Sequence, residues 1–171
     1  MTFKKFTLIV LILIMACAAA EAADIVGLVN SQRIMFSHPM YDATVKFLLL
    51  MSRPLEGNSA QVLNREQDPE RRQMIMKHST QVAEFAEIDR LISAEKDLGK
   101  KNMFWENRQK KLSELEDSLM GPIISECGRA VQAVMALKNM TVLIELDAVY
   151  YGGTEITEDI VQHLRATIEK R

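Results

Sequence analysis

The sequence predicts a mainly helical α+β fold, in which a long helical hairpin arm projects from a small β-sheet body. Residues 25–30 (IVGLVN) and the opening of residues 141–161 (TVLIELDAVYYGGTEITEDIV) read as strands, and more than 100 residues separate them. The intervening chain is strongly helical from Glu70 to about Lys138. Because an isolated strand leaves its backbone groups without partners, we expect the two strands to pair. The helices between them must then leave the sheet and return to it, which makes a hairpin.

The bulk composition agrees with one helix-rich domain. The chain has 171 residues, of which 48% are hydrophobic and 26% charged, as is ordinary for a soluble protein. Aromatic residues make up only 6%, although there are 11 methionines, and few aromatics with many charges suit long helices better than a dense α/β core. The formal net charge of -2 gives no indication of a nucleic-acid partner.

The N-terminus has the pattern of a cleaved signal peptide. Lys4 and Lys5 precede an apolar run (FTLIVLILIMA) that is short for a bilayer span, and Ala20-Glu21-Ala22 matches a small-residue cleavage site. We expect residues 1–22 to be removed and the protein to be exported across a membrane. Two lysines and one glutamate leave with the peptide, so 19 basic and 22 acidic residues remain and the mature net charge is -3.

The two cysteines allow a second interpretation. Cys17 follows Ile14-Met15-Ala16, a loose version of the motif that precedes a lipidated cysteine, and lipid there would tether the protein to a membrane. If cleavage occurs after Ala22, only Cys127 remains, and it cannot form an internal disulfide. Cys127 lies on an apolar helical stripe, so we interpret it as a small buried hydrophobic side chain.

The outgoing half of the chain begins with short elements. Ser31 is a candidate N-cap for a short helix that Pro39 interrupts, and residues 41–51 (YDATVKFLLLM) form a second helix. Pro54, Gly57 and Asn58 then mark a break. Asp68-Pro69-Glu70 is a good helix start, because the aspartate can cap, proline suits the first turn and glutamate complements the helix dipole.

The returning half carries a narrow apolar stripe that is typical of a coiled-coil seam. Gly99 marks one break, and Gly121-Pro122 should kink the helix because proline lacks a donor and clashes with the preceding turn. The stripe residues recur at steps of three and four: Leu112, Leu115, Leu119, Ile123, Cys127, Val131, Val134 and Leu137.

The C-terminal end predicts a second short strand, a turn and a final helix. Tyr150 and Tyr151 would point to opposite faces of that strand, and the glycine pair 152–153 would turn the chain. Thr157 is a plausible N-cap for the terminal helix, which places Ile160, Leu164 and Ile168 on one face.

Three stretches resemble the Skp/OmpH family of periplasmic chaperones: residues 25–41 (IVGLVNSQRIMFSHPMY), residues 119–134 (LMGPIISECGRAVQAV) and residues 143–164 (LIELDAVYYGGTEITEDIVQHL). The resemblance implies a homotrimer whose small bodies form a β core and whose arms surround a cavity like tentacles. It implies an ATP-independent holdase that binds unfolded outer-membrane proteins after translocation. The acidic mature charge departs from the basic family members, so no lipopolysaccharide site is carried over from the family to this chain.

The resemblance divides the mature domain, residues 23–171, into two parts. The body would comprise residues 23–38 and 139–171, and the arm residues 39–138. Turn chemistry places the tip of the arm at residues 54–69, whereas equal hairpin lengths place it near Gly99, which we favour. We expect the cluster KFLLLM (residues 46–51) to pack at the hub of the trimer, with contact to a membrane surface as the alternative.

Met103, Phe104 and Trp105 form the candidate client-contact patch, with packing inside the hairpin as the alternative. Three successive helical residues cannot all face one seam, so we expect at least one to be exposed. The histidines are scattered and no nucleophile sits beside a base, so we expect no metal, no cofactor and no enzyme activity. The alternative function is a structural or tethering coiled-coil protein of the cell envelope, anchored through Cys17.

Overall fold

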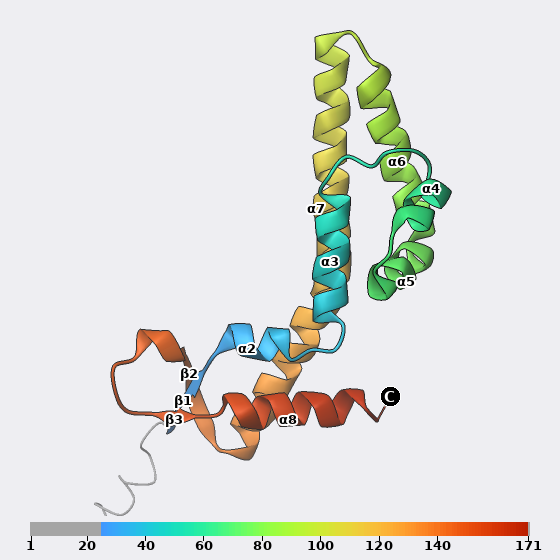
Figure 1. The fold of residues 1–171 in the computed structure, drawn as a ribbon. Helices are drawn as coiled ribbons and strands as arrows, with labels where there is room; N and C mark the ends of the chain where they lie inside the picture. Colours follow the sequence, from blue (N-terminus) through green and yellow to red (C-terminus); the bar gives the residue numbers. More distant parts are fainter. Residues whose placement is uncertain (1–24, 171) are drawn as a thin grey trace, which may run out of the picture.

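The computed structural model describes residues 25–170, which form a small body and a helical arm that stands off it (Figure 1). The chain is mainly helical with a small sheet, which confirms the predicted fold class at that level. The predicted signal peptide and Cys17 lie outside the described residues. The elements are β1 Ile25–Val29, α2 Ser31–Phe36, α3 Tyr41–Met51, α4 Ser59–Arg65, α5 Pro69–Lys77, α6 Ser79–Ala94, α7 Leu98–Leu137, β2 Met140–Glu145, a 3-10 turn Leu146–Ala148, β3 Thr154–Glu155 and α8 Thr157–Ile168.

The sheet pairs the two predicted strands, as expected. Its order is β2-β1-β3, and both neighbours run parallel to β1, with Val26 opposite Val142 and Gly27 opposite Thr154. Parallel neighbours need a long crossover between them. The arm and the returning helix α7 provide that crossover from β1 to β2.

The prediction of a second short strand at Tyr150 and Tyr151, before the glycine pair, is wrong. Residues 149–151 are irregular, and the short strand β3 follows Gly152 and Gly153 instead. The chain must pass from β2 to the opposite edge of β1 and start again in the same direction, which an extended segment cannot do. Tyr150 and Tyr151 consequently lie in this loop and are both fully exposed, rather than on two faces of a strand.

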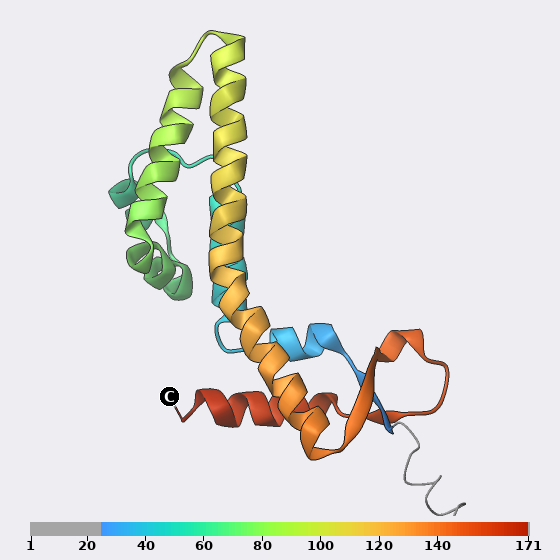
Figure 2. The ribbon, with the colours of Figure 1, turned by 180° about the vertical axis from the view of Figure 1, so that it is seen from behind.

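Helix α7 is the spine of the molecule, because it contacts α3 and α6 in the arm and α2 and α8 in the body. It continues through Pro122, and Figure 2 shows the bend that the sequence predicts there. Beyond the bend, its apolar stripe enters the core of the body. That core consists of Val29, Ile34, Ile123, Cys127, Ala130, Val134, Met140, Ile156, Ile160, Val161 and Leu164.

The arm has more layers than a two-helix hairpin. Its tip is the turn at residues 95–97 between α6 and α7, next to Gly99 as favoured above. The earlier break at residues 52–58, however, leads into α4 and α5, which fold back beside the hairpin (Figure 1). The core of the arm consists of Phe47, Met51, Leu55, Val62, Met74, Ile75, Val82, Phe85, Ala86 and Leu115. Because Phe47 and Met51 are buried within their own arm, the prediction that KFLLLM packs at a trimer hub is wrong.

Two of the three predicted helix caps are corrected. Asp68 caps α5 as predicted and accepts hydrogen bonds from the backbone N–H groups of Glu70 and Arg71. Asn30, rather than Ser31, caps α2 through its side-chain oxygen. Thr157 is buried and does not cap α8, because its hydroxyl accepts a hydrogen bond from Asn30 N–H in the body.

Between residues 25 and 170, no helix is both long and apolar enough to cross a membrane.

Candidate functional site

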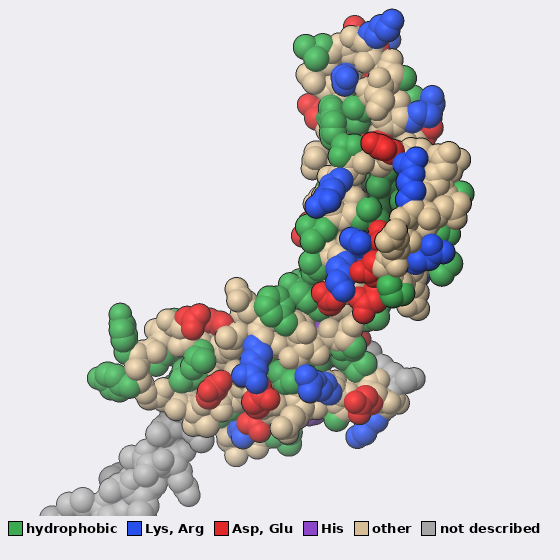
Figure 3. All heavy atoms as spheres, viewed as in Figure 1, with side chains coloured by type: hydrophobic (Ala, Val, Ile, Leu, Met, Phe, Trp, Pro, Cys, Tyr) green, Lys and Arg blue, Asp and Glu red, His purple; other side chains and the backbone are tan. Residues whose placement is uncertain are grey.

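The arm exposes separated apolar side chains between charged ones, as Figure 3 shows for one face. They come from the start of the arm, from α3, from α5 and from the beginning of α7. Three of the five are methionines, whose flexible side chains adapt to differently shaped partners. These residues, which we call the exposed apolar set, are Met40, Leu49, Met76, Leu98 and Met103.

The three residues of the predicted client-contact patch, Met103, Phe104 and Trp105, differ in their exposure to solvent. Met103 is 67% exposed near the tip of the arm, whereas Phe104 and Trp105 are half-buried. The guanidinium carbon of Arg108 lies 5.8 Å from the centre of the Trp105 ring. Met103 is therefore the most solvent-accessible member of the triplet, and Trp105 contributes to packing around Arg108.

A buried ion pair lies beneath this region and was not predicted from the sequence. Arg108 on α7 is 0% exposed and donates from Nε to Oδ1 of Asp89 on α6 at 2.6 Å. Asp89 is 4% exposed. Its position within the apolar row of α6 (Phe85, Ala86, Ile88 and Ile92) is the signal that could have indicated a buried cation.

The same pair holds the end of α3 and the chain that follows it. Nη2 of Arg108 donates to the carbonyl oxygens of Met51 at 2.9 Å and Arg53 at 2.6 Å, and the N–H of Leu55 donates to Oδ2 of Asp89 at 2.7 Å. Nη1 of Arg108 is buried and has no hydrogen-bond partner. One ion pair thus joins α6, α7 and residues 51–55.

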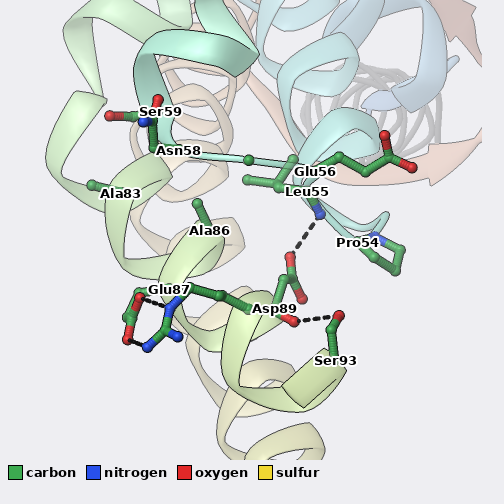
Figure 4. A pocket seen from close by; sticks show the side chains of 12 residues that line it. Pro54, Leu55, Glu56, Asn58, Ser59, Ala83, Ala86, Glu87, Asp89 and Ser93 are labelled. Atoms are coloured by element: carbon green, nitrogen blue, oxygen red, sulfur yellow. Dashed lines mark hydrogen bonds and ion pairs between the residues drawn. The ribbon is translucent and has the colours of Figure 1, made fainter.

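A hollow of about 720 Å³ lies between the loop at residues 54–59 and α6. Figure 4 shows the backbone N–H of Leu55 bonded directly to the Asp89 carboxylate, while Ala83 and Ala86 present small side chains from α6. Glu87 and Arg90 form a two-pronged ion pair at its rim. The loop is therefore joined to α6 by a hydrogen bond beside a hollow that is open to solvent.

The histidines are less scattered than the sequence suggested. His38 and His78 line one hollow of about 320 Å³ where the arm meets the body, whereas His163 on α8 lines a different one. Nε2 of His38 lies 3.0 Å from Oε2 of Glu126. Nε2 of His78 is buried without a partner, and burial foremost, with the Lys77 charge second, lowers the pKa of His78. Within residues 25–170, no three acidic, histidine or cysteine side chains gather as a metal site.

Cys127 is buried in the body core, as predicted. Burial raises the pKa of its thiol, and the negative charge of Glu126 raises it further. The thiol is therefore protonated and shielded, which is the state of a structural cysteine.

Comparison with protein-family models, with curated proteins and with solved structures found no match to this chain.

Proposed function

We propose that the protein is an ATP-independent periplasmic holdase chaperone that binds unfolded outer-membrane proteins and prevents their aggregation. The observation that carries the proposal is the arm, a helical projection that exposes spaced apolar side chains between charges. The signal-peptide pattern and the resemblance of both chain ends to the Skp/OmpH family support the same function. The proposal includes no enzyme activity and no cofactor.

The chemistry of the clients fits such a surface. Strands of outer-membrane barrels alternate apolar and polar residues, so an unfolded strand offers small, spaced apolar contacts. Three exposed methionines, Met40, Met76 and Met103, can repack around many such sequences. Many weak contacts also allow release without ATP.

The proposal includes a homotrimer assembled through the bodies. The body exposes several apolar side chains that a partner copy would cover, namely Phe36, Ile124, Val142, Tyr150 and Tyr151. If assembly stabilises the fold, the melting midpoint should rise with protein concentration. Sedimentation at several concentrations would test this, and a monomeric mass with a constant melting midpoint would contradict the trimer.

The test of function uses the chain from residue 23, which contains both apolar cores. A urea-unfolded outer-membrane β-barrel protein is diluted into buffer with and without the chaperone, and light scattering is followed. We expect suppression at about one trimer per client, together with a soluble complex of matching mass. Gln109→Ser changes an exposed polar residue of the same α7 helix and serves as the control that should keep full activity.

The alternative is the tethering protein anchored through Cys17. Unchanged aggregation with several clients would contradict the holdase. Mass spectrometry of the exported protein would then decide the alternative, because lipid on Cys17 supports the tether and a chain that begins at Ala23 contradicts it.

A further inference from the structure

The methionines of the arm are divided between its apolar core and its surface. Met51 and Met74 are buried in the core of the arm, at 0% and 3% exposure. Met76 and Met103, in contrast, are 57% and 67% exposed, and Met40 at the start of the arm is 40% exposed. Solvent and small solutes therefore reach the side chains of the second group and are kept from those of the first.

Helix α5 shows this division within three residues. Met74 and Ile75 are buried, whereas Met76 is exposed. Because a helix has 3.6 residues per turn, residues two positions apart lie about 200° apart around its axis, on opposite sides. Neither Met76 nor Met103 belongs to either apolar core or packs against one. A chemical change at these two side chains consequently removes no core contact.

An exposed methionine is open to oxidation at its thioether sulfur. Hydrogen peroxide transfers one oxygen atom to Sδ, its O–O bond breaks, and its second oxygen leaves as water. The sulfur is oxidised by two electrons and the peroxide is reduced by two. The product, methionine sulfoxide, is a polar side chain in place of an apolar one. Burial protects a sulfur atom because the oxidant must touch it.

The cysteine of the described residues does not compete for the oxidant. Cys127 is buried in the body core, and burial, followed by the negative charge of Glu126, raises the pKa of its thiol. The thiolate is the reactive form of cysteine, and it is disfavoured here. The exposed thioethers are therefore the accessible oxidisable sulfur atoms of the arm and body.

We propose that Met76 and Met103 are modification sites for oxidants of the hydroperoxide class, and that their conversion to sulfoxide makes the arm surface more polar while both cores stay reduced and folded. The two residues belong to the exposed apolar set, whose members Leu49 and Leu98 carry no sulfur and stay apolar. A further consequence, weaker binding of unfolded clients after oxidation, rests on the proposed holdase function.

The first test measures oxidation residue by residue. The chain from residue 23 is treated with hydrogen peroxide, and peptide mass spectrometry follows the gain of oxygen. Met74 and Met76 lie in one tryptic peptide, QMIMK, so fragmentation compares them within the same sample. We expect Met76 and Met103 to be oxidised at least about tenfold faster than Met74, with Met40 at an intermediate rate. Equal rates for Met74 and Met76 would overturn the proposal.

The second test asks whether the surface changes while the fold does not. After brief treatment we expect weaker retention on a hydrophobic-interaction column and an unchanged urea midpoint. The variant with Met76→Leu and Met103→Leu keeps apolar side chains of similar volume without the sulfur, so its retention should resist peroxide. Met74→Leu, on the buried side of α5, is the matched control and should respond as the wild type does. Equal loss of retention by the double variant, or a lowered urea midpoint, would overturn the proposal.

The third test uses the same samples to measure client binding. We expect oxidised wild type to bind a urea-unfolded β-barrel protein about fivefold or more weakly than untreated wild type, and the double leucine variant to keep its affinity under peroxide. Equal affinity of oxidised and untreated wild type would overturn the consequence for clients. If no sample binds any client, the holdase function is overturned, whereas the oxidation rates and the column retention still decide the modification sites.

Discussion

Arg108 and Asp89 lie 19 residues apart in the sequence and form a two-pronged ion pair inside the arm. Nε donates to Oδ1 at 2.6 Å, and Nη2 donates to Oδ2 at 3.2 Å. The pair also fixes three backbone groups of residues 51–55, so it organises the place where the chain leaves α3. These additional hydrogen bonds act against the desolvation cost of burying the two charges.

Removal of one member of this pair should destabilise the protein more than removal of both. Arg108→Met leaves a buried unpaired carboxylate on Asp89, which should cost about 3–5 kcal/mol of unfolding free energy. Asp89→Leu combined with Arg108→Met leaves no buried charge and should cost clearly less. Urea unfolding of the single and double variants measures both values, and a double variant that loses the sum of the single effects would contradict the coupling.

The hydroxyl of Thr157 should stabilise the body by joining the start of α8 to the end of β1. Thr157→Val removes the acceptor for Asn30 N–H, which lies 2.9 Å from Oγ1, and should cost about 1–3 kcal/mol. Thr167→Val removes a hydroxyl bond on the exposed side of the same helix and should stay within about 0.5 kcal/mol. Equal losses in urea unfolding for the two variants would contradict this role.

The glycine pair 152–153 should differ in its tolerance of alanine. Both have positive φ, +93 and +82, so each alanine should cost roughly 1–2 kcal/mol from the backbone alone. A Cβ on Gly153 would also lie 2.9 Å from Cγ of Leu28, whereas one on Gly152 meets nothing within 4 Å. We therefore expect Gly153→Ala to lower the melting temperature more than Gly152→Ala, and the reverse order would contradict the close approach of this loop to β1.

Stability should fall on acidification because of His78. Its ring lies 5.5 Å from that of Phe47, and burial lowers its pKa in the folded protein. As the pH falls below about 6.5, the unfolded chain takes up a proton at this position more readily than the folded chain, so unfolding is favoured. His78→Phe removes this titration and should flatten the pH dependence below that value. Urea midpoints measured from pH 8 to pH 5 test it, and parallel curves for the two proteins would contradict it.

Local patterns predicted the features that depend on neighbouring residues. Asp68-Pro69-Glu70 contains the complete chemistry of a helix start, and the strand-like run at residues 25–30 needed a partner that only one other stretch offered. The features that were missed depend on distant contacts. The Thr157 hydroxyl binds Asn30 across the body, and Arg108 lies in a charged stretch where nothing local distinguishes it from a solvent-exposed arginine.

The position of α4 and α5 beside the hairpin also depends on contacts between residues that are distant in the sequence. Proline and glycine at residues 54–57 indicate that a helix ends, but they do not say whether the chain continues outward or reverses. Reversal is set by where α5 can bury Met74 and Ile75, namely between α3 and α6. The few apolar residues of these two short helices form too small a pattern to specify that partner in advance.

Met103 and Trp105 should separate client binding from stability. Met103→Ser removes an exposed apolar side chain and should lower client affinity about fivefold, the equivalent of about 1 kcal/mol, without changing the urea midpoint. Trp105→Ser should cost about 2 kcal/mol of stability, roughly half of what truncation of a fully buried tryptophan costs, because the ring is half-buried near Arg108. The exposed α7 variant Gln109→Ser controls for changes in helix content. If Met103→Ser binds an unfolded β-barrel protein as tightly as the wild type, the contact surface lies elsewhere on the arm, and Met40 and Met76 become the next positions to replace.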